Sequence, residues 1–221
     1  MILLVFDHKA NTINWTRIIT KYIINDHLNT LQPRHLQEYE GQIVRTLDAL
    51  DILNSWDKQG RYVFTKSDLA KLINEPTNLL NKTLERLTDQ HVLIRVARGV
   101  YVFRYSAHVG AYTIEEIAQV LRRSEYNYVS LESALSEWGT ISQVPIDRIT
   151  VMTTGRKGEF RTPFGVIEFT HTENSPEYIL ANTIRRDPHP LPIASEQLAL
   201  KNQLRVGRNI DLIEEAQWAN Q

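Results

Sequence analysis

Residues 76–105 read PTNLLNKTLERLTDQHVLIRVARGVYVFRY, and this stretch decides the fold of the first half of the chain. Leucines recur in its first part at the spacing of one helix face: Leu79, Leu80, Leu84 and Leu87. This spacing predicts a helix over 77–89. Two runs with strand character follow, 92–97 and 100–105, and they flank Arg98-Gly99. A short connection containing glycine between two such runs predicts a β-hairpin.

The residues before this stretch predict two further helices and a short strand. Apolar residues at helical spacing predict a helix over 42–55, and residues 62–64 have strand character. A second helix is expected to begin at a cap formed by Thr65 or Ser67, with Asp68 in its first turn. The order helix, strand, helix, turn, helix, hairpin is that of a winged helix. We therefore predict a winged helix-turn-helix domain over 42–106.

The remainder of the chain predicts a different kind of domain. Residues 107–221 alternate helical and strand patterns, which indicates a mixed α/β domain. Thr113 and Glu116 have the spacing of a capping box that opens a helix. Residues 1–41 are predicted to be a helical extension and linker. The fold class expected for the whole chain is α+β. Helices are expected over 113–123, 131–138, 176–184, 195–204 and 210–218, with strands over 148–153 and 165–171.

Composition limits the chemistry that is open to the chain. Its 221 residues contain no cysteine, which removes disulfides, thiolate metal sites and cysteine nucleophiles. The formal net charge is -1, which taken globally argues against a nonspecific polyanion binder. The charge is unevenly distributed, however, because residues 42–105 hold ten basic and seven acidic side chains, a local excess of +3. This basic block coincides with the predicted winged helix.

The helix at 77–89 is the predicted DNA-reading element. Thr77, Asn78, Asn81 and Lys82 are expected to face base edges, and Arg86 is the further basic residue on its outward side. Asn can bond to adenine with both ends of its amide, and Lys or Arg can bond to guanine or phosphate. The alternative is an ordinary solvated helix face.

The hairpin supplies further predicted DNA contacts. Arg95, Arg98 and Arg104 surround Gly99 and are expected to reach phosphates or the minor groove, with Lys66 as a phosphate contact. The alternative is an edge hairpin that charge protects from aggregation.

A second basic segment lies between the strands predicted at 148–153 and 165–171. Its basic residues Arg156, Lys157 and Arg161 are candidates to bind nucleic acid or an acidic partner. Composition favours the alternative, a solvated turn between two strands. The segment has no phosphate-binding glycine pattern.

No motif in the chain predicts an enzyme. The histidines are scattered without an HExxH pair, and there is no GxSxG elbow. We therefore expect no catalytic residue, no metal and no cofactor. No apolar run is long enough to span a bilayer, so no membrane partner is expected, and the localisation expected is cytoplasmic.

Four segments of the chain resemble the AbiEi family, the antitoxins of type IV toxin–antitoxin systems. The wing segment VLIRVARGVYV (92–102) is similar to the family's winged helix, and YVSLESALSEWG (128–139) to its strand-to-helix motif. The most specific segment is RITVMTTGRKGEFRTPFG (148–165), and IASEQLAL (193–200) resembles a late helix start. The last segment has Ser195-Glu196 where a Ser-Pro pair is common, and about 40 residues precede the winged helix.

The resemblance implies a function. Members repress their own operon by binding operator DNA through the winged helix, and inverted repeats are the expected sites. The C-terminal domain is implied to counter a nucleotidyltransferase-like toxin without forming a stable complex with it. Two alternatives stay open: a stand-alone winged-helix regulator, and a protein-interaction module in which the winged helix docks a partner protein. The oligomeric state is left open.

Overall fold

The computed structural model describes residues 44–141, 147–207 and 209. The chain divides into two units, Met1–Gln42 and Ile43–Gln221, and all described residues belong to the second. The extension predicted over 1–41 and the helix predicted over 210–218 therefore lie outside the described residues. Within the described residues the fold contains seven helices and two sheets, which confirms the predicted α+β class.

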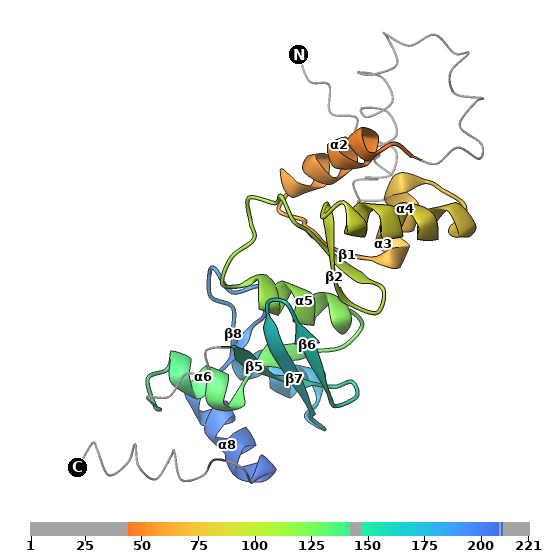
Figure 1. Cartoon of the computed structure of the whole chain (residues 1–221). Coiled ribbons are helices and arrows are strands. Elements are labelled where there is room, and N and C mark those ends of the chain that lie inside the picture. The colour runs from red at the N-terminus through yellow and green to blue at the C-terminus, as the bar shows by residue number, and fades with distance from the viewer. Residues whose placement is uncertain (1–43, 142–146, 208, 210–221) are drawn as a thin grey trace, which may run out of the picture. The chain divides into compact units, whose positions relative to one another are not determined.

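The first part of this unit has the predicted order of elements (Figure 1). Three helices and a three-stranded antiparallel sheet of order β1-β3-β2 compose it. The bounds are α2 Thr46–Asp57, β1 Val63–Thr65, α3 Lys66–Ile73, α4 Thr77–Asp89, β2 Leu93–Ala97 and β3 Val100–Phe103. The hairpin β2–β3 turns at Arg98-Gly99, as the glycine predicted, and Gly99 has φ +74°.

Local capping fixes the ends of α3. The Thr65 hydroxyl accepts from the Asp68 N–H at 3.1 Å, and the Thr65 N–H donates to the Asp68 carboxylate at 2.8 Å. This reciprocal capping box resolves the choice between Thr65 and Ser67 in favour of Thr65. At the other end, Asn74 takes a left-handed conformation and stops the helix.

Three leucines of the predicted stripe of α4 lie in the core, whereas Leu79 is half-buried and outside the buried cluster. Leu80, Leu84 and Leu87 are each at most 2% exposed, and they belong to the same buried cluster as Phe64 and Phe103. Burying a side chain of this size stabilises the fold by about 1.5–3 kcal/mol. The stripe therefore fixes which face of α4 is left to solvent.

The second part of the unit contains a six-stranded sheet of order β6-β7-β5-β4-β9-β8. The pairs β5–β7 and β4–β9 are parallel and the remaining pairs are antiparallel. Four helices accompany this sheet: α5 Thr113–Leu121, α6 Leu131–Glu137, α7 Pro176–Ala181 and α8 Glu196–Val206. The strands are β4 Asn127–Val129, β5 Arg148–Thr153, β6 Gly158–Thr162, β7 Gly165–His171, β8 Thr183–Ile184 and β9 Ile193–Ala194.

The capping box predicted at the start of α5 is wrong. Tyr112 occupies the N-cap position without a side-chain cap bond, and Thr113 is the first residue of the helix. The Thr113 hydroxyl is buried and is used elsewhere, because it accepts from the Gly110 N–H at 2.9 Å and lies 3.2 Å from the Tyr62 hydroxyl. A tertiary contact has taken the side chain that local spacing assigned to the cap.

Helix α5 joins the two sheets. It contacts β1 and β3 of the smaller sheet and also β5 and β7 of the larger one. Just beyond α5, Arg123 donates both of its terminal N–H groups to Asp68 of α3, at 3.0 and 2.7 Å. The predicted boundary at residues 106/107 is thus crossed by side-chain contacts. In the part of the chain that the structure describes, no helix is long and apolar enough to cross a bilayer.

Candidate nucleic-acid interface

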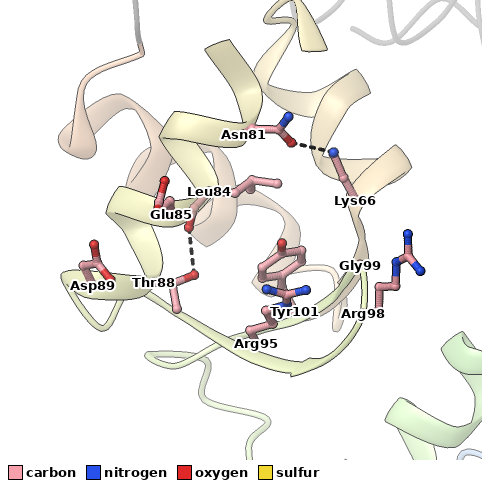
Figure 2. A pocket seen from close by; sticks show the side chains of 10 residues that line it. All are labelled: Lys66, Asn81, Leu84, Glu85, Thr88, Asp89, Arg95, Arg98, Gly99 and Tyr101. Carbon is pink, nitrogen blue, oxygen red and sulfur yellow. Dashed lines mark hydrogen bonds between the residues drawn. The ribbon is translucent and has the colours of Figure 1, made fainter. Parts of the chain in front are cut away.

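An open groove of about 690 Å³ lies between one side of α4 and the hairpin β2–β3 (Figure 2). Helix α4 contributes one wall, the hairpin contributes the other, and Lys66 closes one end. The lining residues are Lys66, Asn81, Leu84, Glu85, Thr88, Asp89, Arg95, Arg98, Gly99 and Tyr101. Four of the predicted DNA contacts, from three separate segments of the sequence, therefore meet here: Lys66, Asn81, Arg95 and Arg98.

Lys66 ties the three segments together. It is the first residue of α3, and its backbone N–H donates to the Gly99 carbonyl at 2.8 Å, which holds the hairpin turn against the start of the helix. Its ammonium donates to Asn81 Oδ1 of α4 at 2.5 Å. Figure 2 shows the two side chains pointing toward one another at the end of the groove.

Strand register places the hairpin side chains. Arg95 of β2 lies directly opposite Tyr101 of β3, and both line the groove, so this face of the hairpin is turned toward α4. The register shifts between Arg95 and Ala97, which marks a bulge before the turn. Arg98 lies in the turn and points away from α4 (Figure 2).

The other predicted contacts on α4 divide between two sides. Thr77, Asn78 and Lys82 are exposed, so they are open to a ligand as predicted. Arg86 is half-buried and donates to the Val44 carbonyl at the start of α2. Arg86 does not line the groove. Successive residues of a helix are rotated by about 100°, so Arg86 lies on the other side of α4 from Asn81. Arg104 is exposed beyond the end of β3 and also lies outside the groove lining.

Two acidic residues that the prediction did not include also line the groove, Glu85 and Asp89. They follow Asn81 at four and eight residues along α4, and this spacing was the signal that could have identified them. The groove therefore holds three cationic side chains, Lys66, Arg95 and Arg98, and two anionic ones. It is a mixed-charge surface with a small basic excess.

Asp68 anchors α3 behind Lys66. Its carboxylate also forms ion pairs with Arg61 at 3.0 Å and Arg123 at 2.7 Å. Burial by itself would raise the pKa of Asp68, but the hydrogen bonds from Arg123 and Thr65 and the charge of Arg61 outweigh it. The pKa of Asp68 consequently lies well below its ordinary value, so the carboxylate stays charged and the start of α3 stays fixed.

The second basic segment does not form one loop, which corrects the prediction. Arg156 and Lys157 lie in the turn after β5, whereas Arg161 lies on β6 and pairs with Glu159 at 3.0 Å. The strand forms because Gly158–Thr162 alternate between more and less exposed positions and pair with β7 in an antiparallel hairpin. None of the three basic residues lines the groove.

The described residues contain no group of three or more histidine, aspartate or glutamate side chains that could hold a metal ion. No pattern in the sequence predicted the buried pair of His189 and Glu115 in the second part of the unit. His189 Nδ1 lies 2.8 Å from Glu115 Oε1, and both side chains are almost fully buried. Burial raises the pKa of Glu115, against the hydrogen bond and charge of His189. The pair joins α5 to the segment before β9.

The fold and the groove define an α+β protein with a mixed-charge groove between a helix and a β-hairpin. The chain belongs to the family described as "Family of unknown function (DUF6088)", which matches residues 51–186. The match covers the groove and most of the six-stranded sheet. No curated protein matches the chain.

Among solved structures, the RV2827C protein from Mycobacterium tuberculosis is similar to part of this chain. The two share 14% sequence identity with a TM-score of 0.48, and the match covers 73% of this chain and 61% of that one. The chain thus spans less than two thirds of that protein's length.

Proposed function

We propose that this chain is a sequence-specific DNA-binding regulator that uses residues 46–103 as a winged helix. The observation that supports this most is the groove, where Lys66, Asn81, Arg95 and Arg98 converge from α3, α4 and the hairpin. A winged helix places its third helix in the major groove and its hairpin beside it on the backbone. Along the described part of this chain α4 is the third helix and β2–β3 is the hairpin that follows it.

The roles of the side chains follow from their places. Asn78, Asn81 and Lys82 lie on the exposed or groove side of α4, where they would meet base edges. Arg98 extends from the hairpin turn, where its guanidinium would meet a phosphate. Arg86 is not assigned to DNA, because it donates to the Val44 carbonyl.

The biological role proposed rests on the resemblance to the AbiEi antitoxins. The chain would repress its own operon from inverted repeats, in the cytoplasm, without enzymatic activity. Its second part would counter a nucleotidyltransferase-like toxin without a stable complex. Since this half of the proposal depends on sequence resemblance, it is tested separately from DNA binding.

Binding of the full chain to a fluorescent duplex from its own promoter tests the first half. We expect tighter binding to this duplex than to a shuffled duplex of equal length, and weaker binding at higher salt. The double variant Arg95→Ala/Arg98→Ala should bind both duplexes more weakly. Lys58→Ala, which removes an exposed cation outside the groove, is the charge control and should bind like wild type. Equal affinity for both duplexes at low salt would refute the regulatory role.

Co-expression with the reading frame beside the gene tests the second half. If that frame encodes a growth-inhibiting nucleotidyltransferase, the chain should restore growth, and the Arg95→Ala/Arg98→Ala variant should restore it equally. Purification of the chain should not retain the toxin. Stable co-purification together with indifference to DNA would instead support the protein-interaction module.

A further inference from the structure

Lys66 and Asn81 form a single hydrogen-bonding unit at the end of the groove. The backbone of Lys66 is held by the Gly99 carbonyl at 2.8 Å, and its ammonium donates to Asn81 Oδ1 at 2.5 Å. Within the described residues, Asn81 Nδ2 has no hydrogen-bond partner. An ammonium has three N–H donors and an amide nitrogen has two, so the pair offers several free donors. Its acceptor, Asn81 Oδ1, has one of its two lone pairs bonded to the ammonium.

Base edges in the major groove differ in what they require from such a pair. Guanine presents two acceptors, N7 and O6, whereas adenine presents the acceptor N7 and the donor amino group N6. Asn reads adenine when Nδ2 donates to N7 while Oδ1 accepts from N6. In this groove an adenine amino group would compete with the Lys66 ammonium for Oδ1, whereas the two guanine acceptors take a donor from each side chain and leave the Lys66–Asn81 bond intact.

We propose that Lys66 and Asn81 together recognise a guanine, and that Lys66 sets this choice by competing with an adenine amino group for the Asn81 carbonyl oxygen. The inference rests on the proposed DNA-binding function and names the base read at that site. It replaces the adenine contact that Asn81 alone would predict. Asn81 Nδ2 and Lys66 Nζ each supply one donor to the two guanine acceptors.

Glu85 extends the same pattern. It lies four residues after Asn81, so the two side chains are neighbours along α4, and it lines the groove. A carboxylate accepts from the cytosine N4 amino group, which stands beside guanine O6 on the edge of a G·C pair. The edge of a G·C pair presents two acceptors, guanine N7 and O6, followed by one donor, the cytosine N4 amino group. Two donors from Lys66 and Asn81 and one acceptor from Glu85 complement that order. Glu85 would therefore favour the cytosine paired with the guanine.

The test begins with selection of bound duplexes from a random pool by the full wild-type chain. Each guanine of the selected duplex is then replaced singly by 7-deazaguanine, which lacks the N7 acceptor. We expect one guanine whose replacement weakens wild-type binding by roughly 5- to 150-fold. At that position Asn81→Ala, which keeps only the Lys66 donor, should prefer guanine over adenine less than wild type does, while Lys58→Ala should keep the wild-type preference.

Lys66 is tested by a change of preference, which a loss of folding cannot imitate. Lys66→Met keeps the stem and frees Asn81 Oδ1, so the preferred base at that position should change from guanine to adenine. Lys66→Arg restores the donors and should restore guanine, and the melting temperatures of both variants show that they fold. Failure of the wild-type chain to select any duplex would overturn the proposed function. Selection without a 7-deazaguanine effect, or an unchanged guanine preference in folded Lys66→Met, would overturn this inference alone.

Discussion

Replacing Asp68 with asparagine should destabilise the protein measurably, because one carboxylate holds three partners. It accepts from Thr65 in the capping box of α3 and forms ion pairs with Arg61 and Arg123. Its side chain is only 12% exposed, although the two arginines are 38% and 49% exposed. Asparagine keeps the shape and one acceptor oxygen but loses the charge.

The magnitude follows from these contacts. Loss of a hydrogen bond to a charged partner costs about 1.5–3 kcal/mol, and an exposed ion pair contributes about 0–1 kcal/mol. Because both arginines are partly exposed, solvent screens their charges, and we expect a loss of stability in the lower part of the range that these contributions sum to. We expect Asp68→Asn to lower the free energy of unfolding by about 2 kcal/mol, which for a domain of this size lowers Tm by about 4–8 °C.

The pH dependence provides a second measurement of the same contact. The pKa of Asp68 is lowered in the folded state, so its contribution is complete above its ordinary value near 3.8 and is lost as pH falls further. The difference between wild type and Asp68→Asn should therefore stay constant from about pH 5 to 8 and shrink below pH 4.

Urea denaturation across this pH range is the assay, with Asp51→Asn as the control because Asp51 is exposed on α2. The control should remain within about 0.5 kcal/mol of wild type. A double-mutant cycle with Arg123→Met isolates the pair that crosses between the two parts of the unit. An Asp68→Asn protein as stable as wild type at pH 7, or a difference that persists unchanged at pH 3, would refute the reasoning.

Three further predictions concern the core, one turn and the groove. Leu87→Ala should lower the free energy of unfolding by about 2–5 kcal/mol in urea denaturation, whereas Leu47→Ala, at a 71% exposed position, should change it by less than about 0.5 kcal/mol. Gly165 has φ +117°, and a Cβ there would lie 2.9 Å from the Asp147 carbonyl oxygen. Gly165→Ala should therefore lower Tm, with a cost of about 1–3 kcal/mol, while Gly110→Ala, with open space around it, should not. In the proposed interface, Arg98→Ala should reduce the slope of log K against log salt by about 1 in anisotropy titrations, and an unchanged slope would remove Arg98 from the phosphate contacts.

The first part of the unit was predictable because local patterns determine it. Leu80, Leu84 and Leu87 of α4 repeat at helical spacing and lie in the core, and Gly99 marks the hairpin turn with φ +74°. Thr65 and Asp68 form a capping box within four residues of sequence. In each case the pattern lies within a few residues of sequence, so spacing indicates the element, although the choice of Thr65 over Ser67 as the cap came from the structure.

Other features could not be predicted from spacing. Thr113 was assigned to a cap, but Tyr62, 51 residues away, and Gly110 occupy its hydroxyl. Arg86 was predicted to contact DNA, and its bond to the Val44 carbonyl, 42 residues away, was not predicted. Strand β6 was missed because a short edge strand needs its partner β7 to be recognised. The contacts of Tyr62 with Thr113 and of Arg86 with Val44 join residues more than 40 positions apart, and no local spacing predicts them.

The charge balance of the groove determines what kind of DNA binding the proposal allows. Lys66, Arg95 and Arg98 are offset by Glu85 and Asp89, and the whole chain has a net charge of -1. If about three phosphates are neutralised, the slope of log K against log salt would be only about -3, well below that of strongly basic binders. Such a surface gains little from nonspecific attraction, because its two carboxylates repel phosphate wherever base contacts do not compensate. The same carboxylates become favourable where a cytosine amino group meets them. A nearly neutral groove therefore favours discrimination between sequences over affinity for DNA in general.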